Sequence, residues 1–134
     1  MRSRQSPLVL GLAGYLLFDA GFNVVGLYGI AQSTQWGKWT KEWTKDDLDH
    51  LSFPERFRFV FPIIKSSSAA GLLIGLRWPR LGRLTAAALV AYFVVALGFH
   101  RRAKDSLVMH APAAFMLVWS AVALRAMRTS QAAR

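Results

Sequence analysis

The chain of 134 residues contains no cysteine. Without thiols it forms no disulfide, thiolate metal site or iron–sulfur cluster of its own, and it performs no thiol redox chemistry. The sequence also lacks a nucleophile and base at motif spacing and a phosphate-binding loop, so it predicts no autonomous catalytic activity. No intrinsic cofactor is indicated, and any redox role would depend on a bound molecule such as a quinone.

Acidic residues are scarce, with 7 Asp and Glu against 17 Lys and Arg and a net charge of +10. A nucleic-acid-binding protein gathers its basic residues on one polar face or in a tail. Here they stand in clusters where apolar runs begin or end, for example Arg56 with Arg58 and Arg101 with Arg102. This pattern is typical of membrane anchors that contact anionic headgroups, and it argues against nucleic acid as a partner.

Long apolar runs are the dominant feature, and 54% of the residues are hydrophobic. A helix needs about 20 mostly apolar residues to cross a bilayer. The runs that qualify are residues 8–31, 57–76, 81–99 and 107–124. Because the last three are joined by short turns, they must be antiparallel neighbours. The sequence therefore predicts an all-α, up-down four-helix transmembrane bundle in which residues 1–134 form a single membrane domain.

The only sizeable extramembrane piece separates the first two runs. Within residues 34–50, Trp36, Trp39 and Trp43 share one face of a helix, while lysines occupy other faces. Indole side chains favour the membrane interface, and lysines reach lipid phosphates. We expect an interfacial amphipathic helix here, with the tryptophans as candidates for contact with a partner. An aromatic cage for a ligand is the alternative.

The orientation of the bundle depends on the charges in its loops. Lys and Arg residues divide evenly between the two sides, so the positive-inside rule does not decide. Acidic residues lie on the side opposite the termini: Glu42, Asp46, Asp47, Asp49, Glu55 and Asp105. We therefore predict that both termini lie in the cytoplasm.

Two charged residues fall inside predicted membrane helices. A charge near the bilayer centre costs at least about 2.5 kcal/mol. Helix rise puts Asp19 and Lys65 both roughly 12 to 17 Å below the same surface, so consecutive antiparallel helices can pair them. The pair either fixes the register of two helices or, with Asn23 one turn further on, contacts a ligand. Pro62 frees a backbone carbonyl and could open such a pocket.

Neither cluster of potential metal ligands has the required spacing. Asp46, Asp47 and Asp49 do not follow the pattern of a calcium loop, and we expect them to be solvated. His100 ends the third predicted helix and His110 lies one turn into the fourth. A histidine pair can bind a metal or a quinone, but helix-end histidines more often sit in the interface. The sequence predicts no metal site.

Small residues recur where helices can touch. Ser67, Gly71 and Gly75 stand four residues apart on the second predicted helix, and Ala87 and Ala91 on the third. Close backbone approach drives association in lipid, so these stripes favour helix packing within the chain. The alternative is a seam between two copies in a homo-oligomer.

The second half of the chain carries a recognisable order of short motifs. They are Phe53-Pro54-Glu55-Arg56-Phe57, Pro62-Ile63-Ile64-Lys65, Ala70-Gly71-Leu72-Leu73, Arg77-Trp78-Pro79-Arg80-Leu81-Gly82, Ala91-Tyr92-Phe93, Phe99-His100 and Lys104-Asp105. This order resembles the DoxX-like family of small four-helix bacterial membrane proteins, with Lys65 and His100 at the family's positions. The tryptophan segment has no counterpart in the pattern.

The resemblance implies the fold more strongly than the function. The family's name is tied to quinone-linked thiosulfate oxidation and to membrane oxidoreductase assemblies. We therefore expect an accessory subunit of a larger membrane complex, embedded in the lipid bilayer of a bacterial inner membrane. The alternative is an autonomous bundle that binds a quinone, a lipid or another lipophilic molecule through Asp19, Asn23, Lys65, His100 and His110.

Overall fold

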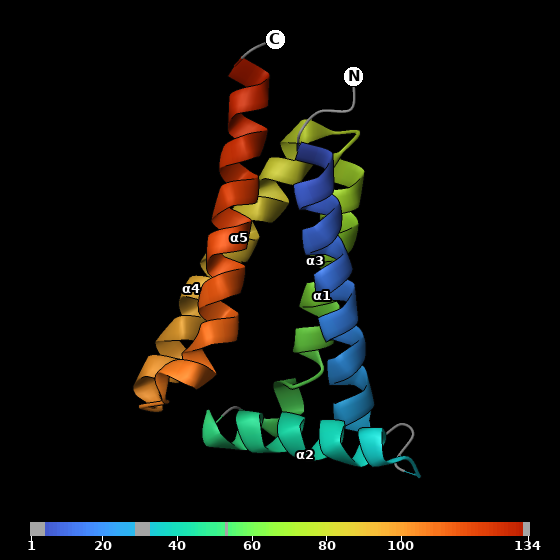
Figure 1. Ribbon diagram of the computed structural model, residues 1–134, viewed down its shortest axis with the longest axis vertical. Helices are drawn as coiled ribbons and strands as arrows, with labels where there is room; N and C mark the ends of the chain where they lie inside the picture. The colour runs from blue at the N-terminus through green and yellow to red at the C-terminus, as the bar shows by residue number, and fades with distance from the viewer. Residues whose placement is uncertain (1–4, 29–32, 53, 133–134) are drawn as a thin grey trace. The chain divides into compact units, whose positions relative to one another are not determined.

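The computed structural model describes residues 5–28, 33–52 and 54–132. Every regular element in this part of the chain is a helix (Figure 1). The elements are α1 (Gln5–Tyr28), α2 (Gln35–His50), the 3-10 helix η1 (Glu55–Phe57), α3 (Val60–Gly75), α4 (Pro79–Arg102) and α5 (Leu107–Ala132). Four segments are long and apolar enough to cross a membrane: Pro7–Tyr28, Glu55–Gly75, Pro79–Arg102 and Leu107–Arg128. The predicted all-α four-helix bundle is confirmed.

Several helices extend past their predicted ends. α4 continues through the basic residues His100, Arg101 and Arg102, and α5 continues beyond Arg125 to Ala132. Apolar composition marks only the part of a helix that lies in the hydrocarbon region. The helix itself continues for as long as its backbone N–H and C=O groups form hydrogen bonds along the axis. α3 is shorter than predicted, because η1 and two turn residues come before Val60. Residues 29–31, the predicted end of the first helix, lie outside the described residues.

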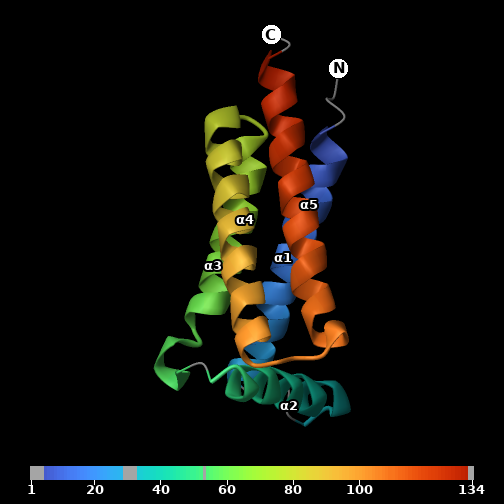
Figure 2. The same ribbon diagram turned by 90° about the vertical axis from the view of Figure 1, so that its left-hand side faces the viewer.

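The chain forms two compact units, which we call the first unit (residues 1–14 and 68–134) and the second unit (residues 15–67). In the first unit α4 and α5 pack side by side and antiparallel, joined by a short turn (Figure 2). Its core is mainly apolar, and Ser120 is fully buried within it. The buried hydrophobic residues are Val9, Leu12, Ala13, Ala69, Leu72, Ala86, Leu89, Phe93, Ala113, Met116, Ala123 and Met127.

Glycines bring α3 and α4 together in the first unit. A Cβ atom at Gly75 would collide with the backbone of Gly82, and one at Gly71 would collide with the side chain of Thr85. The predicted packing of Gly71 and Gly75 within the chain is therefore present. Its partners on α4 are Gly82 and Thr85, which precede Ala87 and Ala91, the two alanines that the sequence singled out.

A hydrogen bond ties α1 to α5 in the same unit. The indole Nε1 of Trp119 donates to the carbonyl of Leu8 at 3.2 Å. Its ring covers Gly11, where a Cβ atom would lie 3.0 Å from the ring edge. Gly11 therefore leaves the space that the indole fills.

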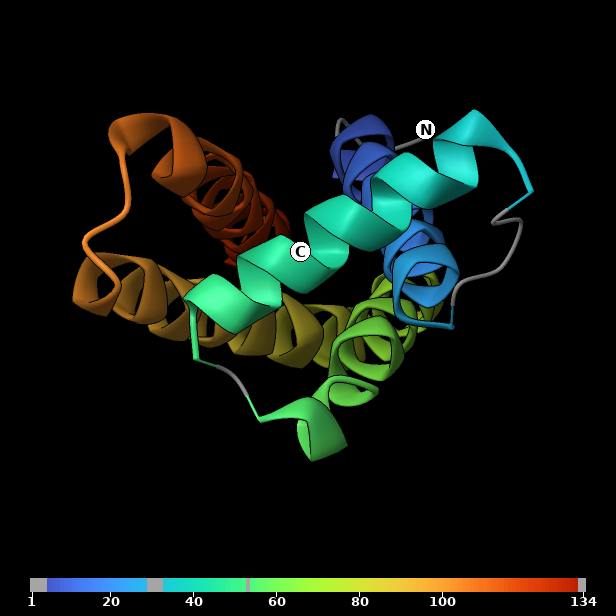
Figure 3. The same cartoon turned by 90° about the horizontal axis from the view of Figure 1, so that it is seen from below.

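In the second unit, α2 lies across the axis of the C-terminal half of α1 (Figure 1), and Figure 3 shows α2 from the side. Asp49, near the end of α2, forms an ion pair with the guanidinium of Arg58. Arg58 is only 9% exposed. This corrects two expectations, since Asp49 is not simply solvated and Arg58 does not serve as a headgroup anchor. The chain reversal through Ser52, with φ of 54°, brings these two residues together.

Pro62 does not open the helix as expected. It lies in the first turn of α3, where a backbone N–H has no partner within the helix. Because Pro62 has no N–H, it cannot donate to the carbonyl of Arg58. That carbonyl accepts a hydrogen bond from the N–H of Phe61 at 3.3 Å instead. The start of α3 is therefore continuous.

Candidate functional site

A charged cluster lies between α1 and α3 in the second unit. The ammonium Nζ of Lys65 is 2.6 Å from Oδ2 of Asp19, as their common depth predicts. The two side chains are 12% and 27% exposed, respectively. The amide Nδ2 of Asn23 lies 3.2 Å from the other carboxylate oxygen and donates to the backbone carbonyl of Asp19 at 2.7 Å. We call Asp19, Asn23 and Lys65 the lysine cluster.

Helical spacing assembles this cluster. Asp19 and Asn23 are four residues apart, so their side chains stack on one face of α1. Both carboxylate oxygens of Asp19 are then engaged, one by Asn23 and one by Lys65. An ammonium carries three N–H donors. Among the described residues Asp19 is the one acceptor assigned to Lys65, so the ammonium can donate further hydrogen bonds.

A second polar cluster lies at the α4–α5 turn of the first unit. Nδ1 of His100 is 2.6 Å from Oδ2 of Asp105, whose side chain is 2% exposed. The ring of His110 lies 5.7 Å from that of His100 between centroids, tilted by 46°. Nδ1 of His110 lies 2.8 Å from the backbone carbonyl of Ser106. We call His100, Asp105 and His110 the histidine cluster.

The turn itself explains the contact between His100 and Asp105. The N–H of Asp105 bonds to the carbonyl of His100, and that of Lys104 bonds to the carbonyl of Arg101. These two bonds define a Schellman motif. In this motif the residue that follows the left-handed residue contacts the side chain five positions earlier in the sequence. That contact is usually apolar. Here it is a hydrogen bond between a carboxylate and an imidazole.

Lys104 adopts the left-handed conformation, with φ of 58°. This conformation costs a non-glycine residue about 1 kcal/mol. We expect Lys104→Gly to raise the free energy of unfolding by up to that amount, as measured by thermal unfolding in detergent micelles. Ala103→Gly is the matched control, because Ala103 has φ of −71° and gains nothing from glycine. Equal effects of the two changes would contradict the assignment of strain to Lys104.

The predicted tryptophan face has an anchor on α1. Phe22 makes edge-to-face contacts with Trp36 and Trp39, with ring centroids 6.4 and 5.8 Å apart. Both indoles remain about half exposed, at 51% and 52%. The side chain of Trp43 lies outside the described part of the structure. Phe22 was not singled out from the sequence, because one phenylalanine in an apolar run carries no signal.

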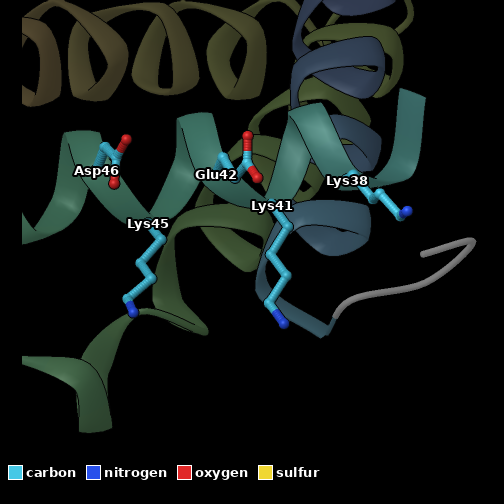
Figure 4. A pocket seen from close by; sticks show the side chains of 5 residues that line it. All are labelled: Lys38, Lys41, Glu42, Lys45 and Asp46. Atoms are coloured by element: carbon cyan, nitrogen blue, oxygen red, sulfur yellow. The ribbon is translucent and has the colours of Figure 1, made fainter. Parts of the chain in front are cut away.

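Another face of α2 is charged. Figure 4 shows a shallow groove lined by Lys38, Lys41, Lys45, Glu42 and Asp46, all on α2. Lys41 and Lys45 extend to one side of the helix, and Glu42 and Asp46 to the other. A groove formed by exposed side chains of one helix has no fixed walls. We therefore read it as a solvated surface.

The five predicted ligand candidates fall into two groups. Asp19, Asn23 and Lys65 are together in the second unit, and His100 and His110 are together in the first. Sequence reasoning missed Asp105 as the partner of His100. No three His, Asp or Glu side chains within the described residues converge as a metal site.

Four helices in the described part of the chain are long and apolar enough to cross a membrane, which defines a small multi-pass membrane protein. Comparison with known proteins narrows this class. A model of the DoxX-like family matches residues 8–122, so the chain belongs to the DoxX-like family. The match includes the tryptophan helix and both polar clusters. No curated protein and no solved structure matches the chain.

Proposed function

We propose that the protein binds a lipophilic molecule in the membrane and that Lys65 contacts an oxygen atom of its head. The supporting observation is the ammonium of Lys65, which is 12% exposed and whose assigned acceptor is Asp19. A charge inside a membrane helix marks a functional site by default, because its cost must be offset. A quinone carbonyl or a lipid phosphate offers the oxygen acceptor that the remaining N–H groups need.

The ligand can be tested by native mass spectrometry of the protein released from membranes in mild detergent. We expect the wild type to retain a lipophilic ligand and the double variant Asp19→Leu/Lys65→Met to lose it. The double change removes both charges, so no unpaired charge is left to unfold the helices. Lys41→Met is the control, because Lys41 is exposed on α2. An unchanged ligand profile in the double variant would overturn the proposal.

A second candidate is an accessory role in a larger membrane complex. It is supported by the half-exposed Trp36 and Trp39, since exposed indoles are common anchors at protein interfaces. Purification from native membranes should then recover a stoichiometric partner that Trp36→Ala/Trp39→Ala releases. A protein that purifies alone would remove the support for this role.

We also infer a bacterial inner-membrane location with both termini in the cytoplasm. Within the first unit, α1 begins and α5 ends at the same end (Figure 1). The acidic residues of the loops lie on the opposite side of the predicted topology, which leaves the side with the termini more positive. Fusions of green fluorescent protein and alkaline phosphatase to the C-terminus test this: fluorescence without phosphatase activity is expected.

A further inference from the structure

We propose that His100 and His110 bind a divalent ion of the zinc class through their Nε2 atoms. The two rings lie 5.7 Å apart in the first unit, where the Schellman motif and the first turn of α5 hold them. Neither the family match nor the lysine cluster assigns this site. It is therefore independent of the proposed function.

Each ring has one nitrogen already engaged. Nδ1 of His110 faces a backbone carbonyl, which only accepts, so Nδ1 carries the proton and donates. Nδ1 of His100 faces the carboxylate of Asp105 and donates to it in the same way. Metal-binding histidines almost always have this arrangement, with one N–H on a carboxylate or carbonyl and the other nitrogen on the metal. In the uncharged form of each ring, which is the form that binds a metal, Nε2 then carries the lone pair.

The separation of the rings suits one shared ion. With a zinc–nitrogen bond of about 2.0 Å and near-tetrahedral angles, two imidazoles on one ion have centroids about 5 to 6 Å apart. The observed 5.7 Å lies in this range. The chain then supplies two ligands, and water or an oxygen of a bound molecule completes the coordination, as in open zinc sites.

The charge around the pair also favours a cation. The carboxylate of Asp105 is nearly fully buried beside His100, so its negative charge is poorly screened by water. The nearby Arg101, Arg102 and Lys104 are exposed, and solvent screens their positive charges. Asp105 acts as a positioning residue, because its carboxylate accepts the Nδ1 proton of His100 and orients the ring.

The test is a zinc titration of the full chain in detergent micelles, carrying an affinity tag without histidine, against a chromophoric chelator. We expect one ion per chain, and at least about tenfold weaker binding in His100→Ala and in His110→Ala. Asp105→Asn should weaken binding about 10- to 100-fold, the usual effect of losing such a partner. His110→Cys should retain binding, because a thiolate replaces the imidazole as a ligand.

His50 provides the matched control, since it is the one other histidine of the sequence and belongs to the second unit. His50→Ala should bind zinc like the wild type. Wild-type affinity in the double variant His100→Ala/His110→Ala would overturn the proposal. So would an equal loss in all three alanine variants, because it would reveal non-specific binding. Circular dichroism confirms that each variant is folded before it is titrated.

Discussion

Replacing Lys65 with methionine is expected to destabilise the protein by about 3 kcal/mol, because it leaves the partly buried carboxylate of Asp19 without its cation inside a membrane helix. Asn23 alone does not compensate for the lost charge. The free energy of unfolding can be measured by denaturation in mixed micelles of dodecyl sulfate and a mild detergent.

The double variant Asp19→Leu/Lys65→Met supplies the decisive comparison. Removing both partners of a buried pair is often neutral or stabilising, so we expect it to recover most of the lost stability. A double variant as unstable as Lys65→Met would show that the lysine stabilises the fold through its packing and not through its charge. Lys41→Met, on the exposed side of α2, should change the stability by less than about 0.5 kcal/mol.

The second large effect is expected at Gly75. Gly75→Val places a branched side chain against the backbone of Gly82, and neither helix can yield without separating from the other. We expect a loss of about 3 kcal/mol or more, at the upper end of overpacking effects, measured by the same denaturation.

Gly98→Ala is the control for this prediction. Gly98 is also helical and in the first unit, but a Cβ atom there meets nothing within 4 Å. It should be neutral or stabilise by up to about 1 kcal/mol, because alanine restricts the unfolded chain. If Gly75→Val and Gly98→Ala had the same effect, the close approach of α3 and α4 would not contribute to stability.

Features that depend on regular helix geometry could be predicted from the sequence. Asp19 and Lys65 were placed at a common depth by counting residues from the helix starts, and the structure pairs them. The two side chains pair although α3 begins three residues later than predicted. In the same way, the four-residue spacing of Gly71 and Gly75 predicted that they pack against another helix of the chain, and they pack against α4.

Features that depend on chain reversals could not be predicted. Asp105 reaches His100 only because Lys104 adopts a left-handed conformation, and no glycine signals that turn. Arg58 likewise reaches Asp49 through a reversal at Ser52, so its charge looked like a headgroup anchor. Hydrophobic periodicity carries no information on either turn.

The hydrogen bond from Trp119 to Leu8 has a consequence for biosynthesis. It joins residues 111 positions apart, and the first unit is made of both ends of the chain. The second unit, in contrast, is one continuous stretch whose residues leave the ribosome before residue 68. Membrane helices are inserted first and associate afterwards. Asp19 can therefore pair with Lys65 before Trp119 is synthesised, whereas Leu8 cannot form its hydrogen bond until Trp119 has entered the bilayer.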